Sequence, residues 1–142
     1  MQVFASLLDA LAFTPSRNAK LRLIGDYLRT TPDPARGYAL AALTGALLFT
    51  GAKSAVIRGL VAERVDPDLF AMSYDYVGDL AETVALIWPE RPRNAPPPTI
   101  DAVVDELSAA SRAEVPKLLE AWLDVLDADG RWALLKLATG GL

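Results

Sequence analysis

Apolar residues recur along this chain at intervals of three and four residues, which is the spacing of one face of an α-helix. Near the N-terminus, Val3, Leu7, Leu8 and Leu11 follow this spacing. No segment alternates apolar and polar residues for long enough to form a β-strand. The pattern predicts an all-α fold, with helices in residues 2–13, 15–31, 32–48, 53–65, 66–77, 79–88, 99–111, 114–128 and 129–141.

Short polar residues stand where several of these helices are expected to begin, because their side chains accept bonds from unpaired N–H groups of the first turn. Two of them are followed by proline, which favours the first helical position. The expected caps are Ser16, Asp33, Asp66, Asp79 and Thr99.

Proline is concentrated in one stretch, residues 89–99, which reads PERPRNAPPPT. Such a sequence favours an extended, semi-rigid connection. A chain of 142 residues is long enough to bury a hydrophobic core. We therefore expect a single domain over residues 1–142, with helical halves at 1–88 and 99–142 and a linker at 89–98.

The composition argues against several kinds of chemistry. The chain has no cysteine, hence no disulfide or thiolate metal site, and no histidine, hence no Ser-His-Asp triad. The acidic run containing Asp124, Asp127 and Asp129 lacks the spacing of a calcium-binding loop, so a helix end followed by a turn is the better interpretation. We expect neither a catalytic nor a metal site in this chain.

The apolar content does not indicate a membrane protein. No apolar run reaches the roughly 18 residues of a membrane span. The N-terminus also lacks the basic start and the cleavage site of a signal peptide. Together with the absence of cysteine, these features predict a cytoplasmic protein with no membrane partner.

Charge is distributed unevenly along the chain, whose net charge is −4. Residues 1–60 carry 7 basic and 3 acidic side chains, whereas residues 61–142 carry 7 basic and 15 acidic ones. A solvated surface of mixed sign is the simpler interpretation. The alternative is a basic face on an acidic body, which binding to phosphates would require.

Tryptophan and tyrosine are candidates either for the core or for stacking on nucleic-acid bases. Trp88, Trp122 and Trp132 lie within apolar helical patterns, which favours the core. Tyr74 and Tyr76 stand at the end of a helix beside a glycine, and both roles stay open for them.

Two glycine-bearing turns are alike, Val77-Gly78-Asp79 and Thr139-Gly140-Gly141. Glycine permits close approach of a backbone, and a helix N-terminus offers unpaired N–H groups. Each turn by itself is explained as a helix stop. Two such turns set side by side would suit two phosphate strands.

Three segments of the chain carry a recognisable sequence: FTPSRNAKLRLIGDYLRTTPDPARGYALAALTG (13–45), VDPDLFAMSYDYVGDLAETVALIWP (65–89) and RWALLKLATGGL (131–142). Their most specific parts are GDLAET and the ending LLKLATGGL. These segments resemble the N-terminal, DNA-binding domain of bacterial ATP-dependent DNA ligases. The resemblance covers essentially the whole chain and is weakest in the proline linker.

The resemblance implies an all-helical domain that encircles nicked double-stranded DNA together with two further domains. It would grip the minor groove and the backbone on both sides of the nick, largely independently of sequence. Asp79 would cap the helix behind its turn without touching the DNA. The implied DNA-binding elements comprise Arg17, Lys20, Lys53, Gly78, Asp79, Thr139, Gly140 and Gly141.

The adenylated lysine of that family lies in a K-x-D-G motif, which none of the four lysines of this chain begins. We therefore expect no ligase activity and no cofactor in this chain. ATP and Mg²⁺ would be used by downstream nucleotidyltransferase and OB-fold domains of a parent ligase in DNA repair, replication and recombination. The resembling sequences continue beyond the position of Leu142 with a basic residue, so part of the second grip is expected to be missing.

A helical protein–protein interaction module, with the acidic second half as its docking surface, is the alternative hypothesis. A phosphate binder loses affinity steeply as salt rises, whereas a contact in an apolar helix groove hardly changes. A third interpretation, a small helical enzyme that uses carboxylates and magnesium, lacks a pair of acidic residues placed to demand a metal.

Overall fold

The computed structural model of the protein describes residues 1–49, 51–92 and 95–142. Within these ranges the regular structure consists of nine α-helices and no β-strand, so the predicted all-α fold is confirmed. None of the described helices has the length and apolar character needed to cross a membrane. The helices are α1 (Gln2–Ala12), α2 (Arg17–Thr30), α3 (Ala35–Leu43), α4 (Ser54–Arg64), α5 (Pro67–Val77), α6 (Leu80–Ile87), α7 (Ile100–Ala109), α8 (Val115–Val125) and α9 (Ala128–Thr139).

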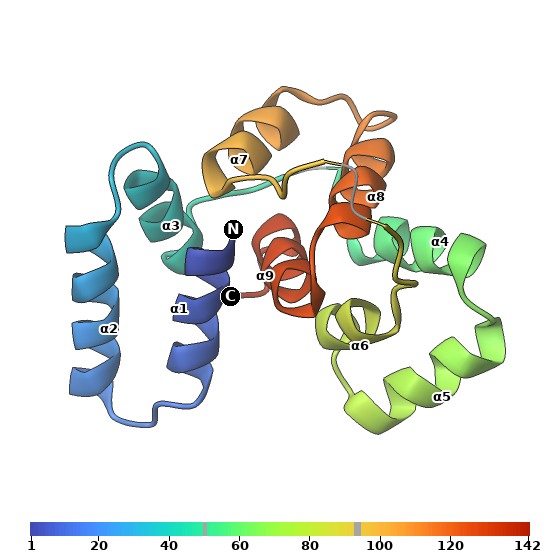
Figure 1. The fold of residues 1–142 in the computed structure, drawn as a ribbon, viewed down its shortest axis with the longest axis horizontal. Coiled ribbons are helices and arrows are strands. Elements are labelled where there is room, and N and C mark those ends of the chain that lie inside the picture. Colours follow the sequence, from blue (N-terminus) through green and yellow to red (C-terminus); the bar gives the residue numbers. More distant parts are fainter. Residues whose placement is uncertain (50, 93–94) are drawn as a thin grey trace.

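Helix α9 occupies the centre of the molecule, between α1 and α6 (Figure 1). Its central place is reflected in its burial, because the surrounding helices cover most of its residues, the charged Arg131 included. Helices α1, α2 and α3 lie on one side of it, and α4, α5 and α6 on the other (Figure 1). The buried residues of α9 are Gly130, Arg131, Ala133, Leu134, Leu135, Leu137 and Ala138.

One hydrophobic core contains side chains from both sides of the proline-rich stretch. Trp88 and Trp122 are buried in it and Trp132 packs against it, so the expected core role of the first two is confirmed. The expectation for α1 was partly wrong, because Val3 is exposed and the adjacent Phe4 is buried instead. The inward face of α1 is Phe4, Ala5, Leu7 and Leu8.

Four of the five predicted helix caps are confirmed. In each, the side-chain oxygen accepts a hydrogen bond from the backbone N–H three residues further on, which satisfies a donor that the helix leaves unpaired. These caps are Ser16, Asp66, Asp79 and Thr99.

The third helix departs from its prediction at both ends. Asp33 does not cap α3, which begins at Ala35 without a side-chain cap. The carboxylate of Asp33 instead accepts hydrogen bonds from the guanidinium of Arg36 at 2.9 and 3.3 Å. The helix ends at Leu43, five residues before the predicted position 48, because Gly45 turns the chain with a φ of +77°.

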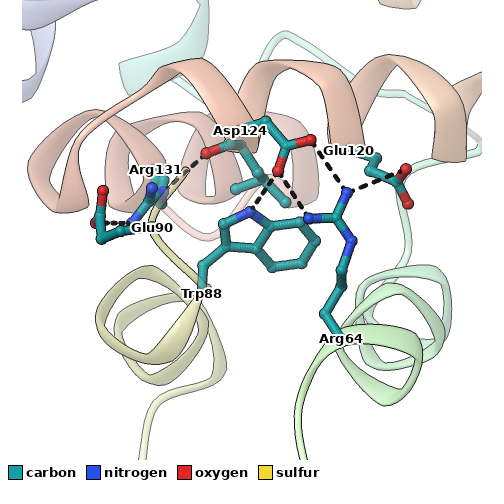
Figure 2. A network of polar contacts seen from close by, with 7 residues as sticks. Arg64, Trp88, Glu90, Glu120, Asp124 and Arg131 are labelled. Atoms are coloured by element: carbon teal, nitrogen blue, oxygen red, sulfur yellow. Dashed lines mark hydrogen bonds and ion pairs between the residues drawn. The ribbon is translucent and has the colours of Figure 1, made fainter. Parts of the chain in front are cut away.

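A polar network ties α4, α6 and α8 together (Figure 2). Asp124 accepts hydrogen bonds from both terminal nitrogens of Arg64, at 2.9 and 3.0 Å, and from the indole N–H of Trp88 at 3.0 Å. The guanidinium of Arg64 lies over the Trp88 ring, 4.9 Å from its centroid, and also pairs with Glu120 at 3.2 Å. Asp124, which the sequence indicated only as part of a helix end, thus connects α8 to α4 and to Trp88 at the end of α6.

Arg131 attaches the proline-rich stretch to the central helix. Its side chain is fully buried, and its Nε donates to the carbonyl of Leu123 at 2.8 Å. Its Nη1 donates to Glu90 at 2.8 Å, at the start of that stretch (Figure 2). Its Nη2 is buried without a hydrogen-bond partner among the described residues. The described part of the stretch forms no helix, and this contact holds its first residues against α9.

Acid is expected to destabilise the fold through Asp124. Burial raises the pKa of this carboxyl, but the hydrogen bonds from Arg64 and Trp88 and the charge of Arg64 outweigh that effect and leave the pKa below its ordinary value of 3.8. The unfolded chain therefore takes up a proton at a higher pH than the folded one, so the stabilisation is complete above pH 3.8 and is lost as the pH falls through the folded pKa.

The free energy of unfolding, measured by urea denaturation at decreasing pH, should be level near neutrality and fall below about pH 4. Replacing Asp124 with asparagine should make that fall shallower. A stability that stays constant or rises as the medium becomes acidic would contradict the assignment.

Candidate nucleic-acid interface

The first glycine turn connects α5 to α6. Gly78 has a φ of +80°, a left-handed conformation, and its N–H donates to the carbonyl of Tyr74 at 2.7 Å, which closes α5. Asp79 then starts α6, because its Oδ2 accepts the N–H of Glu82 at 2.9 Å. The carbonyl of Asp79 also accepts a hydrogen bond from the Thr83 hydroxyl at 2.6 Å. The chain thus reverses from one helix into the next within two residues.

The second glycine turn ends α9 in the same way. Gly140 has a φ of +72°, and its N–H donates to the carbonyl of Lys136. Gly141 donates to that same carbonyl at 3.0 Å. The Thr139 hydroxyl donates to the carbonyl of Leu135 at 2.7 Å. The N–H groups of Gly78, Gly140 and Gly141 are therefore engaged in closing helices and are not free to bind an anion.

Lys136 joins the two turns. Its Nζ donates to Oδ1 of Asp79 at 3.0 Å, across the contact between α6 and α9. A side chain on Gly141 would begin 3.4 Å from Cδ of Lys136, so the lysine also lies against the second turn. The structure thereby sets the two glycine turns side by side. Lys136 was not among the predicted site residues. The sequence feature that could have indicated it is a basic residue in the last turn of a helix, where a positive charge neutralises the negative end of the helix dipole.

The ion pair between Asp79 and Lys136 lies between the two glycine turns and carries no net charge. Burial raises the pKa of Asp79, but the hydrogen bonds from Glu82 N–H and from Lys136, with the charge of the lysine, leave the pKa below its ordinary value. Asp79 is therefore ionised at neutral pH and Lys136 compensates its charge. The first-turn N–H groups of α6, at Leu80 and Ala81, have no acceptor four residues earlier in the helix, as at any helix start.

Lys53, the residue before α4, lies near the second turn. A groove of about 540 Å³ lies between residues 47–49 and 52–54, which precede or begin α4, and the end of α9. Lys53 is exposed there and makes no ion pair within the described ranges. The lining residues are Leu47, Leu48, Phe49, Ala52, Lys53, Ser54, Ala138, Thr139 and Gly140.

Arg17 and Lys20 lie apart from this region. Both are exposed in the first turn of α2, and α2 packs against α1 and α3. Figure 1 shows α2 at the opposite side of α1 from α6. The structure thus brings Lys53, both glycine turns and Lys136 together, whereas Arg17 and Lys20 belong to another face.

The assembled groups suit the binding of an anion, because the turns expose backbone with no side chain and Lys53 supplies positive charge, whereas the charge of Lys136 is compensated by Asp79. The described residues contain no cluster of acidic side chains that would hold a metal ion. No family model matches this chain. Searches among curated proteins and among solved structures likewise found nothing similar to it.

Proposed function

We propose that this chain is the DNA-binding domain of an ATP-dependent DNA ligase. It would hold nicked duplex DNA by the minor groove and the backbone, while separate nucleotidyltransferase and OB-fold domains, using ATP and Mg²⁺, seal the nick. The proposal rests on the resemblance in sequence, and the single observation that supports it is the Asp79–Lys136 contact, which sets the two glycine turns side by side.

The turns would serve as points of close approach. Apart from the glycine itself and its two neighbours in the chain, no atom of the described residues lies within 4 Å of the position that a Cβ would take on Gly78 or Gly140, so both positions face open space. A phosphate strand could reach the backbone there without meeting a side chain. Because the N–H groups of these glycines are engaged, the donors to phosphate would be the first-turn N–H groups of α6 and the ammonium of Lys53.

Affinity is expected to be modest and strongly dependent on salt. Few basic groups surround the turns, and the net charge of −4 opposes binding at long range. Each phosphate that a lysine neutralises contributes about −0.9 to the slope of log affinity against log salt. With Lys53 as the lysine that contacts phosphate, a shallow slope of about −1 is expected.

Replacing Lys53 with alanine should weaken binding to nicked duplex by about threefold to tenfold and should reduce the salt slope by about 1. The measurement is fluorescence anisotropy of a labelled nicked duplex, with intact duplex alongside, at low and at moderate salt. Lys117, an exposed lysine of α8, provides the matched control, and its alanine variant should bind as the parent does.

A second variant tests the turn itself. Asparagine tolerates the left-handed conformation of Gly78, so Gly78→Asn adds a side chain with little backbone strain. It should weaken binding while leaving the unfolding curve nearly unchanged. The proposal fails if the chain does not bind at low salt, or if Lys53→Ala and Lys117→Ala bind equally well.

A further inference from the structure

Two grooves meet on the surface of α6. One, of about 420 Å³, runs between α5 and α6, and the other, of about 230 Å³, lies where α6 faces the end of α1 and the start of α9. Leu86 lines both, so the two form one continuous surface, here called the α5–α6–α9 face. The first is lined by Leu69, Met72, Ser73, Tyr76, Val77, Thr83, Leu86 and Ile87, and the second by Asp9, Ala12, Phe13, Glu82, Ala85, Leu86, Ala128, Asp129 and Trp132.

Large apolar side chains stand exposed on this face. Tyr76 is 93% exposed, Phe13 82%, Met72 72% and Leu86 61%. Single exposed apolar residues are ordinary, but several that line adjoining grooves indicate a surface that another molecule covers. Methionine and tyrosine are also side chains that protein interfaces favour.

The charges of the α5–α6–α9 face are all negative. Neither groove is lined by a lysine or an arginine, whereas Asp9, Glu82 and Asp129 all line the second groove. None of these three carboxylates takes part in an ion pair within the described ranges. This arrangement repels phosphate and favours a cationic group.

The second groove also offers aromatic rings to such a cation. Phe13 and Trp132 line it together with the carboxylates, and a lysine or arginine that enters would meet both negative charge and ring faces. The first groove has no charged lining residue, so it suits an apolar side chain. An occupant that fills both must carry apolar and basic residues on one side.

We infer that the α5–α6–α9 face docks a basic amphipathic helix of a partner protein. Its apolar side chains would lie in the groove between α5 and α6 around Tyr76, and a lysine or arginine would cross Leu86 into the acidic groove. Helix-in-groove recognition uses this combination of apolar anchors and a charged rim. The inference does not rest on DNA binding, because it uses the side chains that line the two grooves, whereas the proposed DNA contact uses Lys53, the glycine turns and the backbone N–H groups of the first turn of α6.

The test uses the whole chain and a designed helical probe. A labelled peptide of about 15 residues, with leucine on one face and lysine on the other, is titrated with the chain, and an otherwise identical leucine–glutamate peptide serves as its control. The lysine peptide should bind saturably and at least about tenfold more tightly than the glutamate peptide. Amide shifts of the ¹⁵N-labelled chain should change around Met72, Tyr76, Leu86 and Trp132.

Variants then separate the two grooves. Met72→Ser with Tyr76→Ser, which change the first groove alone, should weaken the lysine peptide about tenfold. Asp9→Asn with Asp129→Asn, which change the second groove alone, should weaken it and flatten its salt dependence. Matched controls are Leu40→Ser on α3, an exposed leucine, and Glu106→Gln on α7, an exposed acid.

Three outcomes would overturn the inference. They are the absence of saturable binding, equal affinity for both peptides, and losses in the control variants as large as those in the groove variants. Lys53→Ala should leave peptide binding unchanged, so failure of this inference and failure of the DNA proposal are told apart.

Discussion

Replacement of Trp88 with alanine is expected to lower the free energy of unfolding by about 4 kcal/mol, the largest loss of any single substitution considered for this chain. The side chain is 2% exposed, so its removal leaves a cavity that the packed helices fill only in part. It also deprives Asp124 of the indole N–H and Arg64 of the ring beneath its guanidinium. Urea denaturation followed by circular dichroism measures the loss.

Trp88→Phe separates packing from polarity. Phenylalanine keeps a ring beneath Arg64 but cannot donate to Asp124, so we expect a smaller loss of about 2 kcal/mol. Trp132→Ala is the matched control, because Trp132 is only partly buried and should cost less than Trp88→Ala. A loss below about 1 kcal/mol for Trp88→Ala would mean that the side chain is not the packing centre between α6 and α8.

The helices and their starts were predictable because both are local properties of the chain. An apolar spacing of three and four residues marks a helix, and a cap such as Asp79 needs only the N–H three residues later. The cap at Asp33 was predicted wrongly because a nearby arginine competes for the same carboxylate. A pattern of residue types does not reveal which of two local partners the oxygen will take.

The central position of α9 and the network around Asp124 were not predictable in this way. Arg64 and Asp124 are 60 positions apart, and no periodicity in either helix names the other as its partner. The sequence indicated that Asp124 is part of a helix end. That is correct for α8, but it omits the hydrogen bonds that Asp124 accepts from Arg64 and Trp88. Long-range pairs depend on how helices cross, and crossing angles follow from packing of whole faces.

In the candidate site, too, local features were predictable and long-range contacts were not. The two glycine turns were recognised as similar features, and each does end a helix in a left-handed conformation. That they adjoin depends on Lys136, 57 positions from Asp79, and this partner was missed. Arg17 and Lys20 were grouped with the turns as part of a basic edge in the positively charged half of the chain, yet α2 places both on another face (Figure 1).

Replacement of Asp124 with alanine is expected to cost about 3 kcal/mol, the second of the large effects. It removes the acceptor for both terminal nitrogens of Arg64, whose side chain is 11% exposed, and leaves that guanidinium with Glu120 at 3.2 Å. A largely buried cation that loses its closest counter-charge is costly, because the remaining protein replaces only part of the lost solvation.

The double variant Asp124→Ala with Arg64→Met should cost clearly less than the sum of the two single changes, because methionine removes the cation that Asp124→Ala strands and fills similar space. Asp26→Ala supplies the surface control: its pair with Arg29 is exposed on α2, and its loss should stay within about 0.5 kcal/mol. All four variants are compared with the parent by urea denaturation at neutral pH. If Asp124→Ala costs no more stability than Asp26→Ala, the network is a surface feature. If the loss in the double variant equals the sum of the two single losses, Arg64 and Asp124 stabilise the fold through separate contacts. The ion pair between them then contributes nothing of its own.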